Sequence, residues 1–373
     1  MKFIETLDLT SYQTEFEEYL DKKNWNREPK NLYEPIVYII QLSGKRIRPI
    51  LTLMAADILS GNFTKALPAA LAVEVFHNFT LVHDDIMDDA PLRRGKKTVH
   101  EKWDLNRGIL SGDAMLILAY QYFENYPPTI FQKLAILFSK TAIEVCDGQQ
   151  LDIDFETRKE VTISEYLNMI RLKTSVLVAA ALKMGAIVAE SSEKNADLLY
   201  EYGLNLGLAF QLQDDYLDTF GDPETFGKQV GGDIIENKKT FLYIKAMELS
   251  SPEDKKKLEF FYKQKLEDNS IKIDEVKRIF ERCDIPLLIQ KLIEDIQPEM
   301  LVQMVRDIAS GQYSSDKRSE EYLQEDQLPN KVSKRKKPIL SDPAGSYQPL
   351  SRREMEVLTY VSQGLSNKEI GLA

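Results

Sequence analysis

The chain has 373 residues, enough for one large domain or two smaller ones, and hydrophobic residues make up 43% of it, ample for a core. Its formal net charge of −11 argues against a general nucleic-acid binder, whose phosphate contacts need a basic surface. Cys146 and Cys283 lack metal-ligand spacing, and no apolar leader or membrane-length apolar run occurs, so we expect a cytoplasmic protein without disulfides or membrane spans.

The first two predicted helices, residues 1–30 and 32–43, lead to a basic turn. Lys45, Arg46 and Arg48 follow a glycine there, just before the next helix begins. Three cations in a turn at a helix start are well placed to bind a phosphate group. From this segment alone, a solvated basic loop would be equally expected.

The helix predicted from about Leu67 to Asp89 ends in a cluster of carboxylates. Asp84 and Asp88 lie one turn apart on one face, with Asp85 beside them. Like charges at this spacing destabilise an isolated helix by a few tenths of a kcal/mol, so a chain that keeps them usually holds a cation between them. Oxygen ligands without cysteine favour a hard ion such as Mg²⁺, which keeps waters and shares substrate phosphates.

The residues on either side of this cluster favour a diphosphate as the partner of the metal. Arg93 and Arg94 follow in a basic loop and offer fork-shaped donors to phosphate oxygens. His77 precedes Asp84 by two turns, so both lie on nearly the same face. A lone histidine on an apolar helix is nevertheless more often a satisfied core residue.

An acidic motif of the same form recurs in the second half of the chain. Asp214, Asp215 and Asp218 repeat the Asp-Asp-x-x-Asp arrangement within a helix predicted over residues 196–220. One such triplet would most simply be a solvated, acidic helix end. Two copies among apolar residues predict that two Asp-rich helices face each other and hold several Mg²⁺ ions around one diphosphate. Such ions would let an acidic protein bind an anion, because they invert the local field.

Two further segments carry isolated lysines. Lys173 and Thr174 stand at the rim of an apolar helix, where a lysine either snorkels or binds an anion, and the Asp-rich motifs favour the second. Residues 227–233 are glycine-rich and predict a lid, from which Lys228 and Lys238 reach a metal-bound diphosphate.

The predicted fold class is all-α. No alternating β pattern appears before residue 310. Thr162 and Glu165 form a capping box, which is typical of a helix start.

Residues from about 30 to 283 resemble the trans-isoprenyl diphosphate synthase (polyprenyl synthetase) family. Each signature is weak alone, but five in the family's order are highly specific. They are Gly44 to Pro49, the first Asp-rich motif with Arg93-Arg94, Lys173-Thr174, the second Asp-rich motif, and Gly227-Lys228 through Lys238. The resemblance implies a helical bundle with a central substrate cavity and a homodimer.

The activity that the resemblance implies is prenyl transfer dependent on Mg²⁺. Isopentenyl diphosphate would condense with dimethylallyl, geranyl or farnesyl diphosphate, giving farnesyl or geranylgeranyl diphosphate by ionisation, condensation and elimination. Roughly three Mg²⁺ ions would hold the allylic diphosphate. The proton would leave with the departing diphosphate, since no side chain stands out as a base.

The resemblance also implies roles for individual residues. Those assigned to catalysis are Asp84, Asp85, Asp88, Lys173 and Asp214. Those assigned to the metal are Asp84, Asp85, Asp88, Asp214, Asp215 and Asp218. Substrate contacts are assigned to Lys45, Arg48, His77, Arg93, Arg94, Lys173, Thr174, Gln211, Lys228 and Lys238, with isopentenyl diphosphate held by Lys45, Arg48, His77 and Arg94. Gln149 and Asp152 resemble a glutamine-rich stretch near the substrate channel.

Product length is implied by resemblance alone. In the family, bulk just before the first Asp-rich motif forms the floor of the elongation pocket. Phe79 stands five residues before Asp84, next to the small Thr80. One aromatic residue there resembles short-chain synthases, with Phe76 as the second candidate for the floor.

Past Cys283 the resemblance fades. We expect the synthase domain to cover residues 1–310, with 284–310 departing from the family but packing on it. Residues 311–346 read as a polar linker. Residues 347–373 resemble the start of a LuxR-type helix-turn-helix, but the sequence stops before a recognition helix, so no specific DNA binding is expected.

Three alternatives compete with this interpretation. A terpene cyclase also ionises diphosphates but has no use for a second diphosphate site. A DNA-binding regulator is suggested by the C-terminal fragment and disfavoured by its missing recognition helix and by the net charge. A non-catalytic partner subunit would be expected to have lost Asp residues, and both motifs are complete.

Overall fold

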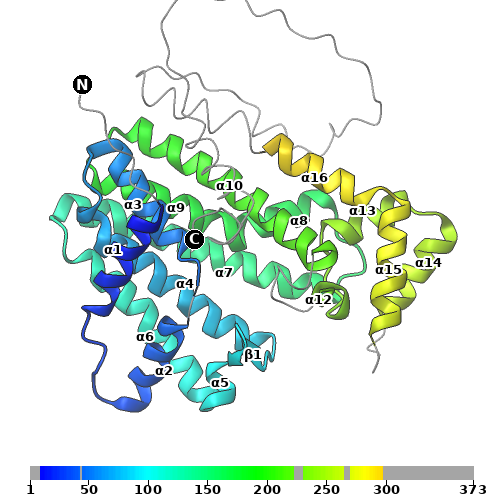
Figure 1. Ribbon diagram of the computed structural model, residues 1–373, viewed down its shortest axis with the longest axis horizontal. Coiled ribbons are helices and arrows are strands. Elements are labelled where there is room, and N and C mark those ends of the chain that lie inside the picture. Colours follow the sequence, from blue (N-terminus) through cyan, green and yellow to red (C-terminus); the bar gives the residue numbers. More distant parts are fainter. Residues whose placement is uncertain (1–8, 43, 222–229, 264–268, 297–373) are drawn as a thin grey trace, which may run out of the picture. The chain divides into compact units, whose positions relative to one another are not determined.

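The computed structural model describes residues 9–42, 44–221, 230–263 and 269–296. Within these ranges the protein consists of helices and one short hairpin (Figure 1), which confirms the predicted all-α class. The chain divides into two compact units, residues 1–146 with 173–204, and residues 147–172 with 205–373.

The first unit contains most of the long helices. Two of them, α7 and α10, continue into the second unit. Its elements are α1 (Leu9–Asp21), α2 (Lys30–Gln41), α3 (Ile47–Ser60), η1 (Thr64–Ala66), α4 (Leu67–Met87), β1 (Leu92–Arg93), β2 (Lys96–Lys97), α5 (Val99–Lys102), α6 (Leu105–Phe123), α7 (Pro128–Thr157), most of the π-helical η2 (Arg171–Ser175), α9 (Val176–Val188) and α10 (Glu193–Phe220).

The core of the first unit forms around α4. This helix is apolar on nearly every side, the pattern of a helix surrounded by others, and it contacts α1, α2, α3, α6 and α9 (Figure 1). Helices α3 and α9 approach so closely that a Cβ atom at Gly185 would lie 2.2 Å from the carbonyl oxygen of Thr52. The amphipathic N-terminal helix buries Phe16 and Leu20, as its pattern predicts.

The segment after α4 differs from the predicted loop. Leu92 pairs with Lys97 and Arg93 with Lys96 in a two-residue hairpin. Its turn needs positive φ at both central positions, and Arg94 and Gly95 have φ of 51° and 72°. The basic residues are therefore held on a rigid turn directly after the Asp-rich end of α4.

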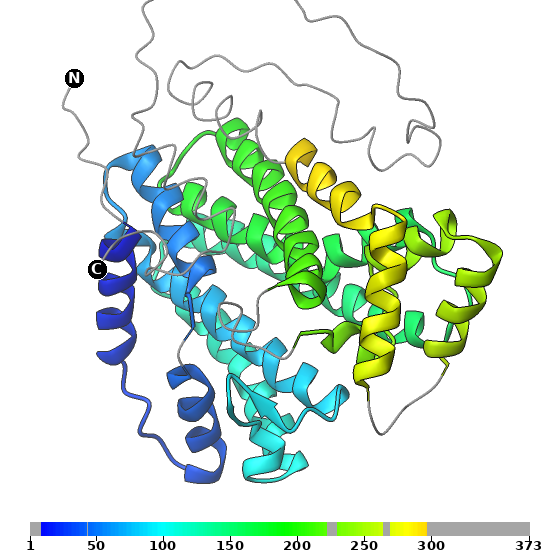
Figure 2. The same ribbon diagram turned by 45° about the vertical axis from the view of Figure 1, so that its right-hand side comes forward.

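The second unit is built from shorter helices around its own core. The predicted capping box is present, since Thr162 accepts from the backbone N–H of Glu165 and the Glu165 carboxylate accepts from that of Thr162. In Figure 2, α15 contacts both α14 and α16. The remaining elements are α8 (Ile163–Ile170), α12 (Gly232–Ile235), α13 (Phe241–Leu249), α14 (Pro252–Phe261), α15 (Ser270–Arg282) and α16 (Ile285–Ile296).

The start of the segment 284–310, which is predicted to depart from the family, packs on this second core. In α16, Ile285, Ile289 and Ile293 are buried at a spacing of one turn. The predicted linker 311–346 and the fragment 347–373 lie outside the described residues. Among the helices that the structure describes, none is long and apolar enough to cross a membrane.

Candidate active site

The first Asp-rich motif lies at the C-terminal end of α4. Asp84 is in the last turn, and its carbonyl oxygen accepts from the backbone N–H of Asp88 at 2.9 Å. Burial, together with the charges of Asp88 and Asp85, raises the pKa of Asp84 to about 6, although Lys173 and Arg93 oppose this rise. Carboxylates are also unfavourable at this end of a helix dipole. A bound cation would relieve both costs.

Asp85 has a different environment from its neighbours. It is 1% exposed, its Oδ1 accepts from Nε of Arg93 at 2.7 Å, and Nη2 of the same guanidinium group lies 2.7 Å from this oxygen in an ion pair. Its Oδ2 is buried without a hydrogen-bond partner in the described part of the chain. Asp85 is thus placed to orient Arg93, whereas Asp88 is exposed.

The hairpin brings Arg94 to the basic turn before α3. Its Nη1 donates to the carbonyl oxygen of Leu42 at 3.1 Å. A Cβ atom on Gly44 would lie 2.7 Å from the same Nη1. Glycine at position 44 therefore leaves the space that the guanidinium group occupies.

Arg48 and His77 form the centre of a cationic cluster with Arg94. Nη1 of Arg48 lies 3.3 Å from Nε2 of His77. Burial, followed by the charges of Arg48 and Arg94, holds the pKa of His77 well below its usual range. The imidazole is therefore neutral at physiological pH, and Lys45 is exposed nearby in the turn.

The Arg46 side chain has a different environment from those of Lys45 and Arg48. Its side chain is buried and paired with Glu74 of α4, and it also donates to the carbonyl oxygen of Ile40. The expectation that all three cations of this turn bind a phosphate is therefore corrected for Arg46. The interior pairing is invisible in the sequence because Glu74 lies 28 residues away.

Lys173 and Thr174 lie in the π-helical segment η2. Single π-helical turns occur frequently at functional sites. Lys173 lies close enough to Asp84 for its charge to lower the pKa of that carboxyl group.

The second Asp-rich motif repeats one feature of the first. Asp215 is 3% exposed, its Oδ2 accepts from the Tyr166 hydroxyl group, and its Oδ1 accepts from Nε2 of Gln211 at 3.0 Å. Burial and the nearby Asp233 raise the pKa of Asp215. As in the first motif, the middle carboxylate is held by neighbouring side chains. Gln211 therefore contacts the motif itself.

Asp218 joins the second motif to the segment that follows it. Its Oδ2 accepts from the backbone N–H of Asp233 at 3.0 Å, at the start of α12. Burial and the charge of Asp218 raise the pKa of Asp233 to about 7, against the effect of Lys238. Asp233 was missed by the sequence reasoning, and its only signal is its place after the Gly231-Gly232 pair.

Lys238 lies beside these carboxylates. Its Nζ is 2.9 Å from Oε2 of Glu236 and 3.9 Å from Oδ1 of Asp233, and these charges raise its pKa against the effect of burial. Asp152 of α7 contributes to the same field, and Gln149 is buried one turn before it. Lys228 and the start of the predicted lid, residues 227–229, lie outside the described residues, whereas Gly232 and Asp233 of that segment begin α12.

The predicted chain-length residues belong to an aromatic row on α4. The ring of Phe79 lies 5.4 Å from that of Phe76 and 4.8 Å from that of His83. Phe76 in turn meets the ring of Phe138 of α7 at 4.9 Å. The Thr80 hydroxyl group donates to the carbonyl oxygen of His77. Threonine is also much smaller than phenylalanine, so Thr80 fills less space than Phe79.

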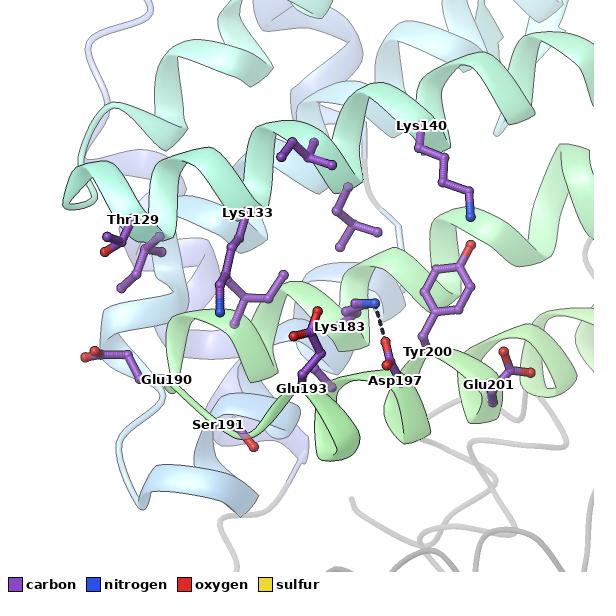
Figure 3. A pocket seen from close by; sticks show the side chains of 15 residues that line it. Thr129, Lys133, Lys140, Lys183, Glu190, Ser191, Glu193, Asp197, Tyr200 and Glu201 are labelled. Carbon is purple, nitrogen blue, oxygen red and sulfur yellow. Dashed lines mark hydrogen bonds and ion pairs between the residues drawn. The ribbon is translucent and has the colours of Figure 1, made fainter. Parts of the chain in front are cut away.

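A separate pocket of about 660 Å³ lies in the first unit between α7, α9 and the start of α10 (Figure 3). None of the predicted site residues lines it. Lys183, at its centre, is paired with Asp197. The ring of Tyr200 lies near the ammonium groups of Lys140 and Lys183. With Glu190 and Glu193 on its rim, this pocket is poorly suited to an anionic substrate.

The helical fold, the two Asp-rich motifs and the arginine cluster are those of the all-α enzymes that act on isoprenyl diphosphates. The Polyprenyl synthetase family model matches residues 29–281. The chain therefore belongs to the polyprenyl synthetase family.

Individual relatives agree with this assignment. A geranylgeranyl diphosphate synthase of Methanosarcina mazei is 46% identical over 223 residues, covering 59% of this chain and 68% of the relative. A short chain isoprenyl diphosphate synthase of Methanocaldococcus jannaschii is 40% identical over 268 residues, covering 71% and 79%. A crystal structure of a geranylgeranyl pyrophosphate synthase matches with a TM-score of 0.76 and 50% identity, covering 85% of this chain and 97% of that one.

The C-terminal fragment has a relationship of its own. Residues 348–373 match the model of bacterial regulatory proteins of the luxR family. This agrees with the helix-turn-helix resemblance of these residues, which lie outside the described part of the chain.

The raised pKa of Asp84 predicts how the protein without metal responds to pH. Below about pH 4 this carboxyl group is protonated in the folded and unfolded states alike. Between pH 4 and 6 the folded state binds more protons, so stability falls as pH rises, and the loss is complete above about pH 6. In chelator, Asp84→Asn should therefore melt above wild type at pH 8, with the difference shrinking toward pH 4.

The check is a series of thermal melts of both proteins in chelator. Asp89→Asn changes a neighbouring exposed carboxylate and should show no such pH-dependent difference. A constant difference between wild type and Asp84→Asn across this pH range would contradict the environment described for Asp84.

Proposed function

We propose that this protein is a short-chain trans-prenyltransferase that joins isopentenyl diphosphate to an allylic diphosphate. One observation carries the proposal: α4 bears two chemically different groups of side chains seven residues apart. His77 lies with Arg48 of α3 among several arginines, which suits an anion, whereas Asp84 with Asp88 would supply ligands for a cation. A single helix thus offers places for two diphosphates.

The residues of the first motif fit Mg²⁺. Within the described residues, no group of three or more His, Cys, Asp or Glu side chains could hold a metal alone. Mg²⁺ does not need such a cage, because it is usually bound through one or two carboxylates, several waters and substrate phosphates. Asp84 and Asp88 would be these carboxylates, and Asp214 and Asp218 their counterparts in the second motif. Bound there, Mg²⁺ would neutralise the charge that develops on a departing diphosphate.

Different residues of the chain would bind the two substrates. Arg93, held by Asp85, and Lys173 would contact the allylic diphosphate, and Lys238 would do so from the second motif. Stabilising the leaving oxygens lowers the barrier to C–O ionisation. Lys45, Arg48, His77 and Arg94 would hold isopentenyl diphosphate so that its double bond attacks the allylic cation.

Proton loss completes the reaction. The neutral His77 belongs to the diphosphate cluster, and no other described side chain is placed as a base for the new carbon chain. The departing diphosphate is therefore the proposed acceptor of the proton. Apolar side chains of α4 would exclude water, which would otherwise quench the cation.

The decisive assay is incubation with isopentenyl diphosphate, each allylic primer and Mg²⁺, followed by identification of the products by mass. Condensation products support the proposal. Cyclised hydrocarbons formed from one diphosphate alone would instead support a terpene cyclase.

Asp84→Asn should lower kcat by about a hundredfold or more, because a neutral amide is a poor ligand for Mg²⁺ and the leaving charge loses its stabilisation. Helix content measured by circular dichroism should not change. Asp89→Asn, the adjacent exposed carboxylate, serves as the matched control and should keep wild-type turnover. Wild-type rates for Asp84→Asn, or full activity in excess chelator, would refute the metal-assisted mechanism.

The proposal includes a product of farnesyl or geranylgeranyl length, with Phe79 as the floor of the elongation pocket. Its ring is 8% exposed and lies against Phe76 and His83, so it is held in one place on α4.

Phe79→Ala should shift the products to longer chains, because the truncation opens space one turn before Asp84. Products are compared by mass with those of wild type and of Phe131→Ala, an exposed aromatic on α7. An unchanged distribution would move the floor to Phe76, the next ring in the row.

We also propose that the protein is a homodimer, on the basis of exposed apolar residues on α6 and α7. Leu110 and Ile117 are each 59% exposed on α6, and Ile136 and Ile143 are each 64% exposed on α7. Each pair is spaced by seven residues, close to two helical turns, and so lies on one face of its helix. A second copy of the chain is the proposed cover for these faces.

Ile117→Glu should convert the dimer to a monomer, because a charge would be buried at the interface without a partner. The molar mass is measured by size-exclusion chromatography with light scattering. Leu287→Glu places the same charge at an exposed leucine of α16 and should leave the mass unchanged. Equal masses for both variants and wild type would refute the proposed interface.

A cytoplasmic location is the last part of the proposal. Cys146 and Cys283 are both free thiols, which fits a reducing compartment. Fractionation of cells that express the protein tests it, and recovery in a membrane fraction would count against it.

A further inference from the structure

Glu74 is a buried carboxylate that the proposed reaction does not use. It is 3% exposed and lies on α4, three residues before His77. Four arginines, at positions 46, 48, 93 and 94, lie in the same part of the first unit. An ion buried there is costly unless it is paired and hydrogen-bonded.

The hydrogen bonds of Glu74 connect three helices. Its Oε1 accepts from Nη1 of Arg46, at the start of α3, and from Nδ2 of Asn78 at 3.0 Å on α4 itself. The other end of the Arg46 guanidinium group donates to carbonyl oxygens at the end of α2, those of Ile40 and Leu42. Arg46 and Glu74 thus connect the ends of α2 and α3 to α4.

The same connection reaches the diphosphate-binding arginines. The carbonyl oxygen of Leu42 accepts from Arg46 and also, at 3.1 Å, from Arg94. Arg48 follows Arg46 by two residues and contacts His77. Burial and the charges of neighbouring arginines lower the pKa of Arg48 and of Arg94, and the charge of Glu74 opposes this and so stabilises their protonated forms. One carboxylate therefore offsets the repulsion among the arginines that surround it.

We propose that Glu74, through its buried pair with Arg46, is a positioning residue that preorganises Arg48, His77 and Arg94 for the diphosphate of isopentenyl diphosphate. Neither Glu74 nor Arg46 touches this substrate. Their role is to hold like-charged donors together before the anion arrives. The inference rests on the proposed function, because it takes the substrate of this cluster from that proposal.

A buried carboxylate elsewhere in the first unit provides a matched control. Asp57 of α3 is 7% exposed and accepts from the Tyr12 hydroxyl group at 2.7 Å. Like Glu74, it bonds to another helix, but no arginine contacts it in the described residues. Asp57→Asn therefore measures the general effect of turning a buried carboxylate into an amide.

The test compares steady-state kinetics of Glu74→Gln, Arg46→Lys, Arg48→Ala and Asp57→Asn. For Glu74→Gln, we expect KM for isopentenyl diphosphate to rise about tenfold, while kcat and KM for the allylic substrate change by no more than about twofold. Arg46→Lys keeps the positive charge but loses the two-pronged guanidinium group. It should also raise KM for isopentenyl diphosphate, by less than Glu74→Gln does. Asp57→Asn should lower the melting temperature without this selective change.

The outcomes separate the inference from the proposed function. If Arg48→Ala raises KM for isopentenyl diphosphate but Glu74→Gln and Arg46→Lys behave like Asp57→Asn, the positioning role is refuted and the proposed function stands. If Glu74→Gln does not fold, the KM of Arg46→Lys for isopentenyl diphosphate tests the positioning role: a rise supports it, and an unchanged value refutes it. If Arg48→Ala leaves this KM unchanged, the substrate assignment is wrong and the inference falls with it.

Discussion

Burial of like charges beside one another is the constraint on which the rest of this structure depends. The protein places carboxylates at the end of α4 and gathers arginines from the start of α3 and from the hairpin around His77. Asp85 of the first group and Arg46 of the second are buried. Asp85 is paired with Arg93 through one of its oxygens, and Asp215 is hydrogen-bonded to Tyr166 and Gln211. In both motifs the middle carboxylate is compensated within its own unit. The outer carboxylates are the ligands proposed for an external cation.

Much of this could be predicted from the sequence, because it depends on local spacing. Helical periodicity, the capping box at Thr162 and the Asp-Asp-x-x-Asp repeats all involve residues within a few turns of each other. What could not be predicted depends on contacts between distant residues. The sequence alone suggests Arg46 as a third phosphate ligand, but the structure pairs it with Glu74. No sequence pattern marks Asp233, whose backbone N–H at the start of α12 donates to Asp218 of α10. The hairpin at residues 92–97 was read as a loop because two-residue strands leave no alternation to detect.

At two glycines, larger side chains approach the backbone closely. A Cβ atom at Gly112 would lie 2.3 Å from Nε2 of His83, and one at Gly44 would meet the guanidinium group of Arg94. The His83 ring lies against Phe79 and so supports the aromatic row on α4. Small residues that look like simple helix or turn signals thus leave room for larger side chains. Helix α4 contributes both central core residues and the proposed ligands, so the packing of the helices in this unit also places the proposed site.

The two diphosphate sites proposed on α4 differ in the sign of their charge, and this difference would distinguish two substrates with the same head group. The arginines around His77 attract an anion directly, with Glu74 limiting their mutual repulsion. The carboxylates around Asp84 repel an anion until a cation is bound. A diphosphate without metal should therefore enter the arginine cluster, whereas one that carries metal is recruited to the carboxylates. The isoprenoid tails of the substrates look alike to an apolar wall, so the sorting must come from these charges. An acidic protein can in this way bind two anions within two turns of one helix, because arginines would balance the charge of one anion and a bound cation that of the other.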